Sequence, residues 1–207
     1  MTATATDPAV QTATSLTPAA SHRIFRAVLD ALARPGEPAR LPVPPRSAAA
    51  RETPAGLLPM LALADLGTGI HVLEHPDRPA RWSAALSTAT SAPVVPLERA
   101  RLVGALRPIT PAEVGALCRG SSLAPEEAAL LAVAVTDLAG GPARWALSGP
   151  GVPGRRAVAP SGVPAGFLAA RAAAVHRYPA GIDVLLVAPD GRLVGLPRGT
   201  TVEKESR

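Results

Sequence analysis

The run IDVLLV, residues 182–187, constrains the fold more than any other part of the sequence. It is rich in apolar, β-branched residues, and prolines and glycines mark its ends, which predicts a buried strand. Pro189, Asp190 and Gly191 are turn formers, so residues 193–196 are expected to return beside it as an antiparallel hairpin. A strand that is apolar on both faces lies inside a sheet covered on both sides. The chain must therefore supply other strands and covering helices.

Apolar spacing and turn residues predict the remaining elements. Ser21 is expected to cap a helix from His22 to about Arg34, with an apolar face of Phe25, Val28, Leu29 and Leu32. The passage from Pro38 to Pro45 allows only a short edge strand. Further helices are expected at 53–67, with Thr53 as the cap, and at 79–86, 110–119 and 164–175, and further strands at 70–73, 94–95, 130–135 and 144–148.

This succession predicts an α/β fold, a three-layer sandwich with a mixed central sheet. With 207 residues, one domain is the default. We expect a disordered N-terminal tail at residues 1–20, a single α/β domain at 21–203 and a C-terminal tail at 204–207.

Composition excludes several classes of protein. The net charge is +5, but the positive charge is almost all arginine, and Lys204 is the only lysine. No basic run exceeds two residues and only 2% of residues are aromatic, which argues against nucleic-acid binding. We see no signal peptide and no segment long enough to cross a bilayer, so a cytoplasmic protein without a membrane partner is expected.

Arg198 follows the second strand of the hairpin, next to Gly199, Thr200 and Thr201. Strand ends often carry the ligand-binding groups of α/β sheets, so Arg198 and Thr200 are candidate anion-binding residues. Arg34 is a third candidate, and the loop from Gly149 to Gly151 could add backbone amides. The alternatives are a solvated arginine after a strand and a tight structural turn.

Three other polar residues have alternative interpretations. His71 and His75 could bind a metal, but their segment is expected to be extended and no third ligand is evident, so two partly exposed histidines fit better. Cys118, the only cysteine, follows Val114 and Leu117 at helical spacing, which indicates a small buried residue rather than a nucleophile.

Several stretches together resemble one family. They are, in chain order, FRAVLDALARPGEP, LPMLALADLGTGI, SAPVV, APEEAALLAVAVTDLAGG, LSGPGV, YPAGIDVLLV and GLPRGTTVE. Their order and spacing, over about residues 20–203, resemble the H subunit of the carbon–phosphorus lyase core complex, the PhnH family. The chain departs from the family pattern at Tyr178, Ala180 and Gly199. Gly199 stands where the family usually has threonine, which removes a hydroxyl after Arg198.

The resemblance implies a homodimer, a complex with the G, I and J subunits, and a fold similar to that of pyridoxal-phosphate-dependent transferases. With the G, I and L-type subunits, this family helps to form ribose 1-methylphosphonate 5-triphosphate from methylphosphonate and ATP, releasing adenine. It implies no catalytic residues, and we expect no turnover by the isolated chain. A pyridoxal enzyme needs a core lysine, which Lys204 cannot supply, so no cofactor is expected. The alternative is a phosphonate- or nucleotide-anion-binding protein that acts outside a stable complex.

Overall fold

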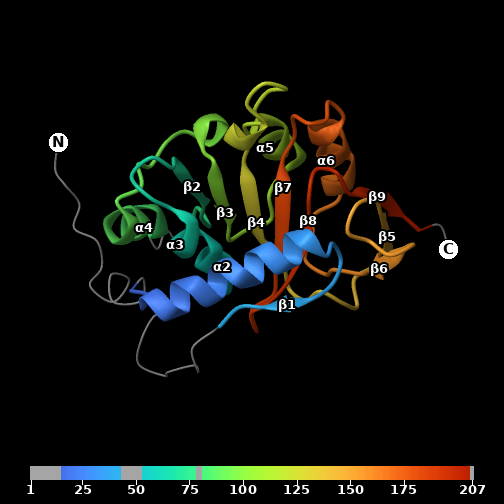
Figure 1. The fold of residues 1–207 in the computed structure, drawn as a ribbon, viewed down its shortest axis with the longest axis horizontal. Coiled ribbons are helices and arrows are strands. Elements are labelled where there is room, and N and C mark those ends of the chain that lie inside the picture. The colour runs from blue at the N-terminus through green and yellow to red at the C-terminus, as the bar shows by residue number, and fades with distance from the viewer. Residues whose placement is uncertain (1–14, 43–52, 78–80, 206–207) are drawn as a thin grey trace.

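A six-stranded mixed sheet forms the centre of the fold (Figure 1). In the computed structural model, which describes residues 15–42, 53–77 and 81–205, the strand order is β1-β8-β7-β4-β3-β2. Strands β2, β3, β4 and β7 are parallel, whereas β8 is antiparallel to both of its neighbours. This confirms the predicted α/β fold with a mixed sheet. The bounds are β1 (Ala39–Arg40), β2 (Ile70–Leu73), β3 (Leu102–Ala105), β4 (Leu130–Ala134), β7 (Asp183–Val187) and β8 (Arg192–Leu196).

The β7–β8 hairpin lies where the sequence predicts it. Its turn is closed by a hydrogen bond from the Gly191 N–H to the Ala188 carbonyl oxygen, at 3.0 Å. Gly191 has φ = +83°, a conformation that glycine adopts without strain. The Asp190 carboxylate also accepts the Arg192 N–H at 3.0 Å. The turn residues therefore set the register that brings Leu196 opposite Val184.

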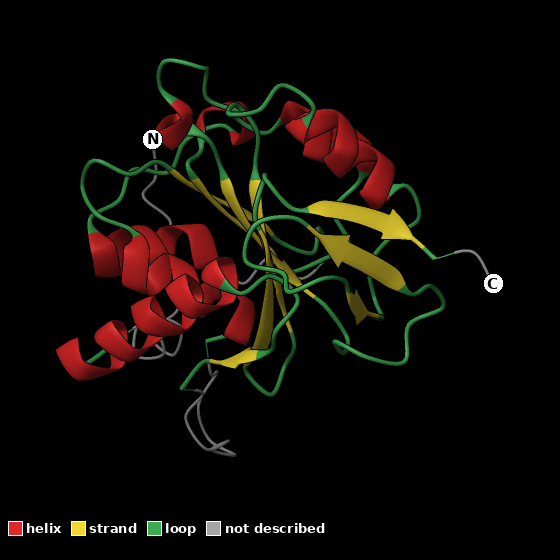
Figure 2. Cartoon of the chain, turned by 45° about the vertical axis from the view of Figure 1, so that its right-hand side comes forward, coloured by secondary structure: helices red, strands yellow, loops and turns green. Residues whose placement is uncertain are grey.

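Helices cover both faces of this sheet (Figure 2). Side chains alternate along β7, so Val184 and Leu186 enter the hydrophobic core on one face, and Leu185 and Val187 enter the core on the other. The second of these cores is shared with α2 (Pro18–Ala33), α3 (Leu58–Leu63) and α4 (Trp82–Thr90), and the first with α5 (Pro111–Ala116) and α6 (Phe167–Val175). None of the described helices is long and apolar enough to cross a membrane.

A smaller antiparallel sheet joins the α5–α6 side of the fold. Its strand order is β6-β5-β9, with bounds Arg156–Val158, Trp145–Ser148 and Thr201–Lys204. Trp145 of β5 stacks on Phe167 of α6, with ring centroids 6.3 Å apart. The strands predicted at 130–135 and 144–148 both exist, but they belong to different sheets. Lys204, predicted to lie in a tail, is exposed at the end of β9.

The first helix differs from its prediction at its start and in its buried face. It begins at Pro18, inside the predicted tail, because Thr17 is the cap and accepts the Ala20 N–H at 3.2 Å. Phe25 and Leu29 are exposed rather than buried. Val28 is buried as predicted and Leu32 packs partly against the core, and Ile24, Ala27 and Ala31 complete the face against the sheet.

Other helix and strand boundaries shift by a few residues. The helix predicted at 53–67 starts as a 3-10 turn, η1 (Ala55–Leu57), continues as α3 and ends at Leu63; Pro54, not Thr53, takes the cap position. Helix α4 runs to Thr90, α5 ends at Ala116 and α6 begins at Phe167. At 94–95 only an isolated parallel bridge from Val94 to Ile70 forms. Predictions for residues 1–14, 43–52 and 78–80 lie outside the described residues.

Small residues let α2 approach the sheet closely. A Cβ at Gly195 of β8 would lie 2.3 Å from the Ala31 carbonyl oxygen of α2, which is backbone and cannot rotate away. The absence of a side chain at Gly195 therefore decides how near the helix lies. This contact also explains why alanines rather than Phe25 and Leu29 face the sheet.

We predict that Gly195→Ala separates α2 from β8 and lowers the free energy of unfolding by about 2–3 kcal/mol, the usual cost of overpacking. Gly115→Ala is the matched control, since nothing lies within 4 Å of its added methyl group and alanine favours a helix. Urea denaturation of both variants measures the difference. Equal stability of the two variants would contradict the close-contact explanation.

Candidate functional site

Arg198 lies at the amino ends of the parallel strands, because β8 runs antiparallel to β7. Leu196 is paired with Val184, so the chain leaves β8 next to Asp183, the first residue of β7. Open α/β sheets bind ligands beyond the carboxyl ends of their parallel strands. Arg198 is therefore at the opposite edge of the sheet from the expected location.

The Arg198 guanidinium is engaged with a carboxylate of the same chain. Its Nη2 donates to Asp183 Oδ2 at 2.6 Å, and its Nε lies 3.2 Å from both Asp183 oxygens. Nη1 donates to the carbonyl oxygens of Pro125 at 2.7 Å and Pro179 at 3.2 Å. The Arg198 and Asp183 side chains are only 16% and 23% exposed. An anion at Arg198 would have to compete with Asp183.

Arg171 is a second buried cation close to this pair, and no local pattern in the sequence indicates it. It lies on α6, 3% exposed, and its Nη2 donates to the carbonyl oxygens of Pro197 at 2.6 Å and Thr200 at 3.1 Å. Burial lowers the pKa of Arg171 to about 10, and the negative charge of Asp183 opposes that shift. Arg171 therefore ties the turn after β8 to α6 while remaining protonated at neutral pH.

Thr200 is close to Arg198 but does not share its contacts. Its N–H closes a turn on the Pro197 carbonyl oxygen at 2.9 Å. Its hydroxyl is buried and accepts or donates no hydrogen bond among the described residues. The turn thus places Thr200 beneath the surface, 2% exposed.

The loop from Gly149 to Gly151 packs between two segments of backbone. A Cβ at Gly151 would lie 2.4 Å from the Ala33 carbonyl oxygen at the end of α2, and one at Gly149 would lie 3.0 Å from the Gly199 carbonyl oxygen. Both glycines have a positive φ, +121° at Gly149 and +78° at Gly151. This geometry matches the structural alternative, a tight turn that joins the end of α2 to the 199–200 turn.

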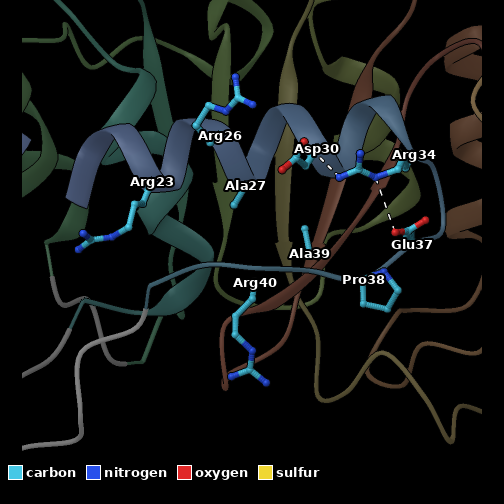
Figure 3. Close-up of a pocket in the computed structure, with 9 residues that line it drawn as sticks. All are labelled: Arg23, Arg26, Ala27, Asp30, Arg34, Glu37, Pro38, Ala39 and Arg40. Atoms are coloured by element: carbon cyan, nitrogen blue, oxygen red, sulfur yellow. Dashed lines mark ion pairs between the residues drawn. The ribbon is translucent and has the colours of Figure 1, made fainter. Parts of the chain in front are cut away.

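Arg34 lies in a different place, at the rim of a groove between α2 and β1 (Figure 3). The groove has a volume of about 360 Å³. Arg34 Nη2 lies 3.2 Å from Asp30 Oδ1, and its Nε lies 3.6 Å from Glu37 Oε1. The structure therefore brings Arg198, Thr200 and the glycine loop near one another, and the loop also contacts the residues on either side of Arg34, but the Arg34 side chain enters a separate groove.

That groove has several arginines that the sequence analysis did not single out. Arg23, Arg26 and Arg40 also line it. All three are exposed, and none forms a hydrogen bond or ion pair within the described ranges. The three-residue spacing of Arg23 and Arg26 on a predicted helix could have revealed part of this cluster.

Two groups of paired charges lie at the carboxyl ends of the parallel strands, Arg192 with Asp137 and Asp190, and Arg107 with Glu113. Arg107 follows β3, and its Nη1 donates to Glu113 Oε2 at 3.1 Å. Glu113 also accepts the N–H of Thr110 at 2.8 Å in a capping box at the start of α5. The hydrogen bonds from Arg107 are the largest cause that lowers the pKa of Glu113 to about 2. The TPAE spacing could have identified this carboxylate.

The histidines and the cysteine occupy separate structural positions. The ring of His71 in β2 is 2.9 Å from the Val95 carbonyl oxygen, and the exposed His75 lies 3.8 Å from Asp77. No group of three or more metal-ligating side chains occurs among the described residues. Cys118 lies beyond the end of α5, partly buried, and its Sγ donates to the Glu127 carbonyl oxygen at 3.3 Å.

The structure thus defines an α/β protein with a mixed sheet, whose strand-end charges pair with one another. The family model described as bacterial phosphonate metabolism protein (PhnH) matches residues 13–203. The chain belongs to this family, and the family has a role in phosphonate metabolism. A search of curated proteins found no match.

We predict that Asp183→Asn lowers the free energy of unfolding by about 3 kcal/mol, because two largely buried guanidinium groups lose their counter-charge. Glu203→Gln is the matched control, since Glu203 pairs with Arg155 at the surface, where both side chains are more than half exposed. Glu203→Gln should lower the free energy of unfolding by less than about 1 kcal/mol, because an exposed ion pair contributes little. Thermal unfolding of both variants at pH 7 makes the comparison, and similar melting temperatures would refute a structural role for Asp183.

Proposed function

We propose that the chain is an accessory subunit of a carbon–phosphorus lyase core complex in organic phosphonate catabolism. With the G, I and L-type subunits it would help to form ribose 1-methylphosphonate 5-triphosphate from methylphosphonate and ATP, with release of adenine. Its other partners would be the J subunit and a second copy of itself. The observation that carries the proposal is the family match over residues 13–203.

The way in which the strand-end charges are paired supports an accessory rather than a catalytic role. Arg198 is held by Asp183, and Arg107 is held by Glu113. A group in a fixed internal pair is poorly placed to change its partner during a reaction. The proposal therefore assigns no catalytic residue to this chain.

Further features of the family form part of the same proposal. The fold would be similar to that of pyridoxal-phosphate-dependent transferases without their cofactor. The only lysine, Lys204, is exposed at the end of β9, where it cannot form a buried Schiff base. A cytoplasmic location follows from the substrates, since ATP is an intracellular compound.

The second candidate function, binding of a phosphonate or nucleotide anion outside a stable complex, has weaker support. In this function, the anion would accept hydrogen bonds from Arg198, Thr200, Arg34 and the Gly149–Gly151 loop. The Arg34 side chain pairs with Asp30 and Glu37 although its chain neighbours contact the glycine loop, and Asp183 already faces the Arg198 guanidinium. A ligand would have to displace a carboxylate that also accepts the Arg198 N–H at 2.7 Å.

We predict that the chain, when tagged and co-expressed with the G, I and J subunits of its own organism, is captured with them in one assembly of defined mass. Affinity capture followed by light scattering measures that mass. The chain alone should release no adenine from ATP and methylphosphonate. Recovery of the chain free of all three subunits, or adenine release by the isolated chain, would contradict the proposed role.

A further inference from the structure

The outward side of α2 exposes two large apolar residues. Phe25 is 41% exposed and Leu29 is 43% exposed. They are four residues apart on a helix, so their side chains are neighbours on one face. The opposite side of the helix, with Ile24 and Val28, is buried against the sheet. The exposed pair therefore contributes to no core that the described residues form.

Exposed arginines lie on the same helix as this apolar pair and on the neighbouring strand. Arg23 and Arg26 alternate with it along the helix, and Arg40 extends from β1 on the far side of the groove (Figure 3). The two carboxylates of the groove are already neutralised, since Asp30 pairs with Arg34 and Glu37 pairs with Arg34 and Arg156. The guanidinium groups of Arg23 and Arg26 thus have no ion-pair partner in the described part of the chain, whereas Arg40 is near enough to Asp190 for its charge to help lower the pKa of that carboxyl group.

The arrangement of these arginines does not suit a small anion. In Figure 3, Arg26 extends from the side of α2 away from β1, and Arg40 extends from β1 away from the helix. Their guanidinium groups therefore diverge instead of surrounding one point.

A second copy of this chain does not suit the surface either. In a two-fold symmetric contact the same patch meets itself, and the patch of Arg23, Phe25, Arg26 and Leu29 contains no carboxylate that could pair with the arginines of the other copy. Like charges placed together in an interface oppose association. The charge of the surface instead complements carboxylates. Exposed aromatic and arginine side chains are also the types that protein interfaces favour.

We propose that the α2 surface, defined as Arg23, Phe25, Arg26 and Leu29, docks an acidic, partly apolar surface of a different protein subunit. The apolar pair supplies the area removed from water, and the arginines select a partner that presents carboxylates. This inference rests on the proposed function, since it names the part of the chain that enters the complex. It requires no change in the fold, because all four side chains are already exposed.

The test uses the full chain co-expressed with the G, I and J subunits. The double variant Phe25→Ser/Leu29→Ser removes the apolar contact, and Arg23→Glu/Arg26→Glu reverses the charge. Each should weaken capture of the other subunits at least 10-fold. Capture by the wild-type chain should fall as salt rises, and capture by the charge-reversed chain should lose that salt dependence. Exposed substitutions leave the melting temperature almost unchanged, which circular dichroism verifies.

Matched controls lie on loops at the amino ends of the parallel strands. Leu123→Ser changes a leucine that is 97% exposed, and Arg177→Glu reverses an exposed charge after α6. Both controls should assemble like the wild-type chain. Normal assembly of both α2 variants would overturn the docking inference and leave the proposed function intact. Failure of the wild-type chain to assemble would contradict both, and loss of self-association alone would show that α2 contacts a second copy.

Discussion

The carboxylate of Asp183 connects parts of the chain that are far apart in sequence. Asp183 is the first residue of the central strand β7. Its carboxylate accepts hydrogen bonds from the backbone N–H and the guanidinium of Arg198, which follows β8. Its negative charge also stabilises the protonated form of the buried Arg171 on α6. Arg198 in turn reaches the carbonyl oxygens of Pro125 and Pro179, in the segments that precede β4 and β7. The amino ends of the parallel strands are thus held by one cluster of charges. Asp183, Arg198 and Arg171 stabilise one another there, because a buried charge without a counter-charge would be costly.

The sequence predicted the elements whose signal is local. The β7–β8 hairpin, strand β2 and the cap of α5 depend on nearby turn formers, apolar runs and the Thr110–Pro111 pair, and all lie where expected. The buried face of α2 was predicted only in part, because Val28 is buried and Leu32 packs against the core as expected, whereas Phe25 and Leu29 are exposed. The decisive contact is instead between Gly195 and the Ala31 carbonyl oxygen, residues 164 positions apart, which no local pattern contains.

The candidate site was less predictable for the same reason. The sequence shows that Arg198 follows a strand and that Asp183 lies within an apolar strand. Only the antiparallel pairing of β7 and β8 brings the two together at the amino ends of the parallel strands. Arg171 sits in an alanine-rich helix and becomes buried only when β9 and the turn at Thr200 pack beside it. Arg34 seemed to belong with Arg198, yet its neighbours Asp30 and Glu37 hold it at the groove between α2 and β1.

Two groups of arginines in this chain thus have different surroundings, a largely buried pair, Arg171 and Arg198, and an exposed pair on α2, Arg23 and Arg26. The buried arginines stabilise the fold, and the exposed ones on α2 are available to a partner. Hydrogen–deuterium exchange of the chain, free and assembled with the G, I and J subunits, tests this division most directly. The account predicts that amides of residues 22–34 exchange more slowly in the assembly, while residues 183–200 exchange slowly and equally in both states. New protection around Arg198 with no change in α2 would contradict it.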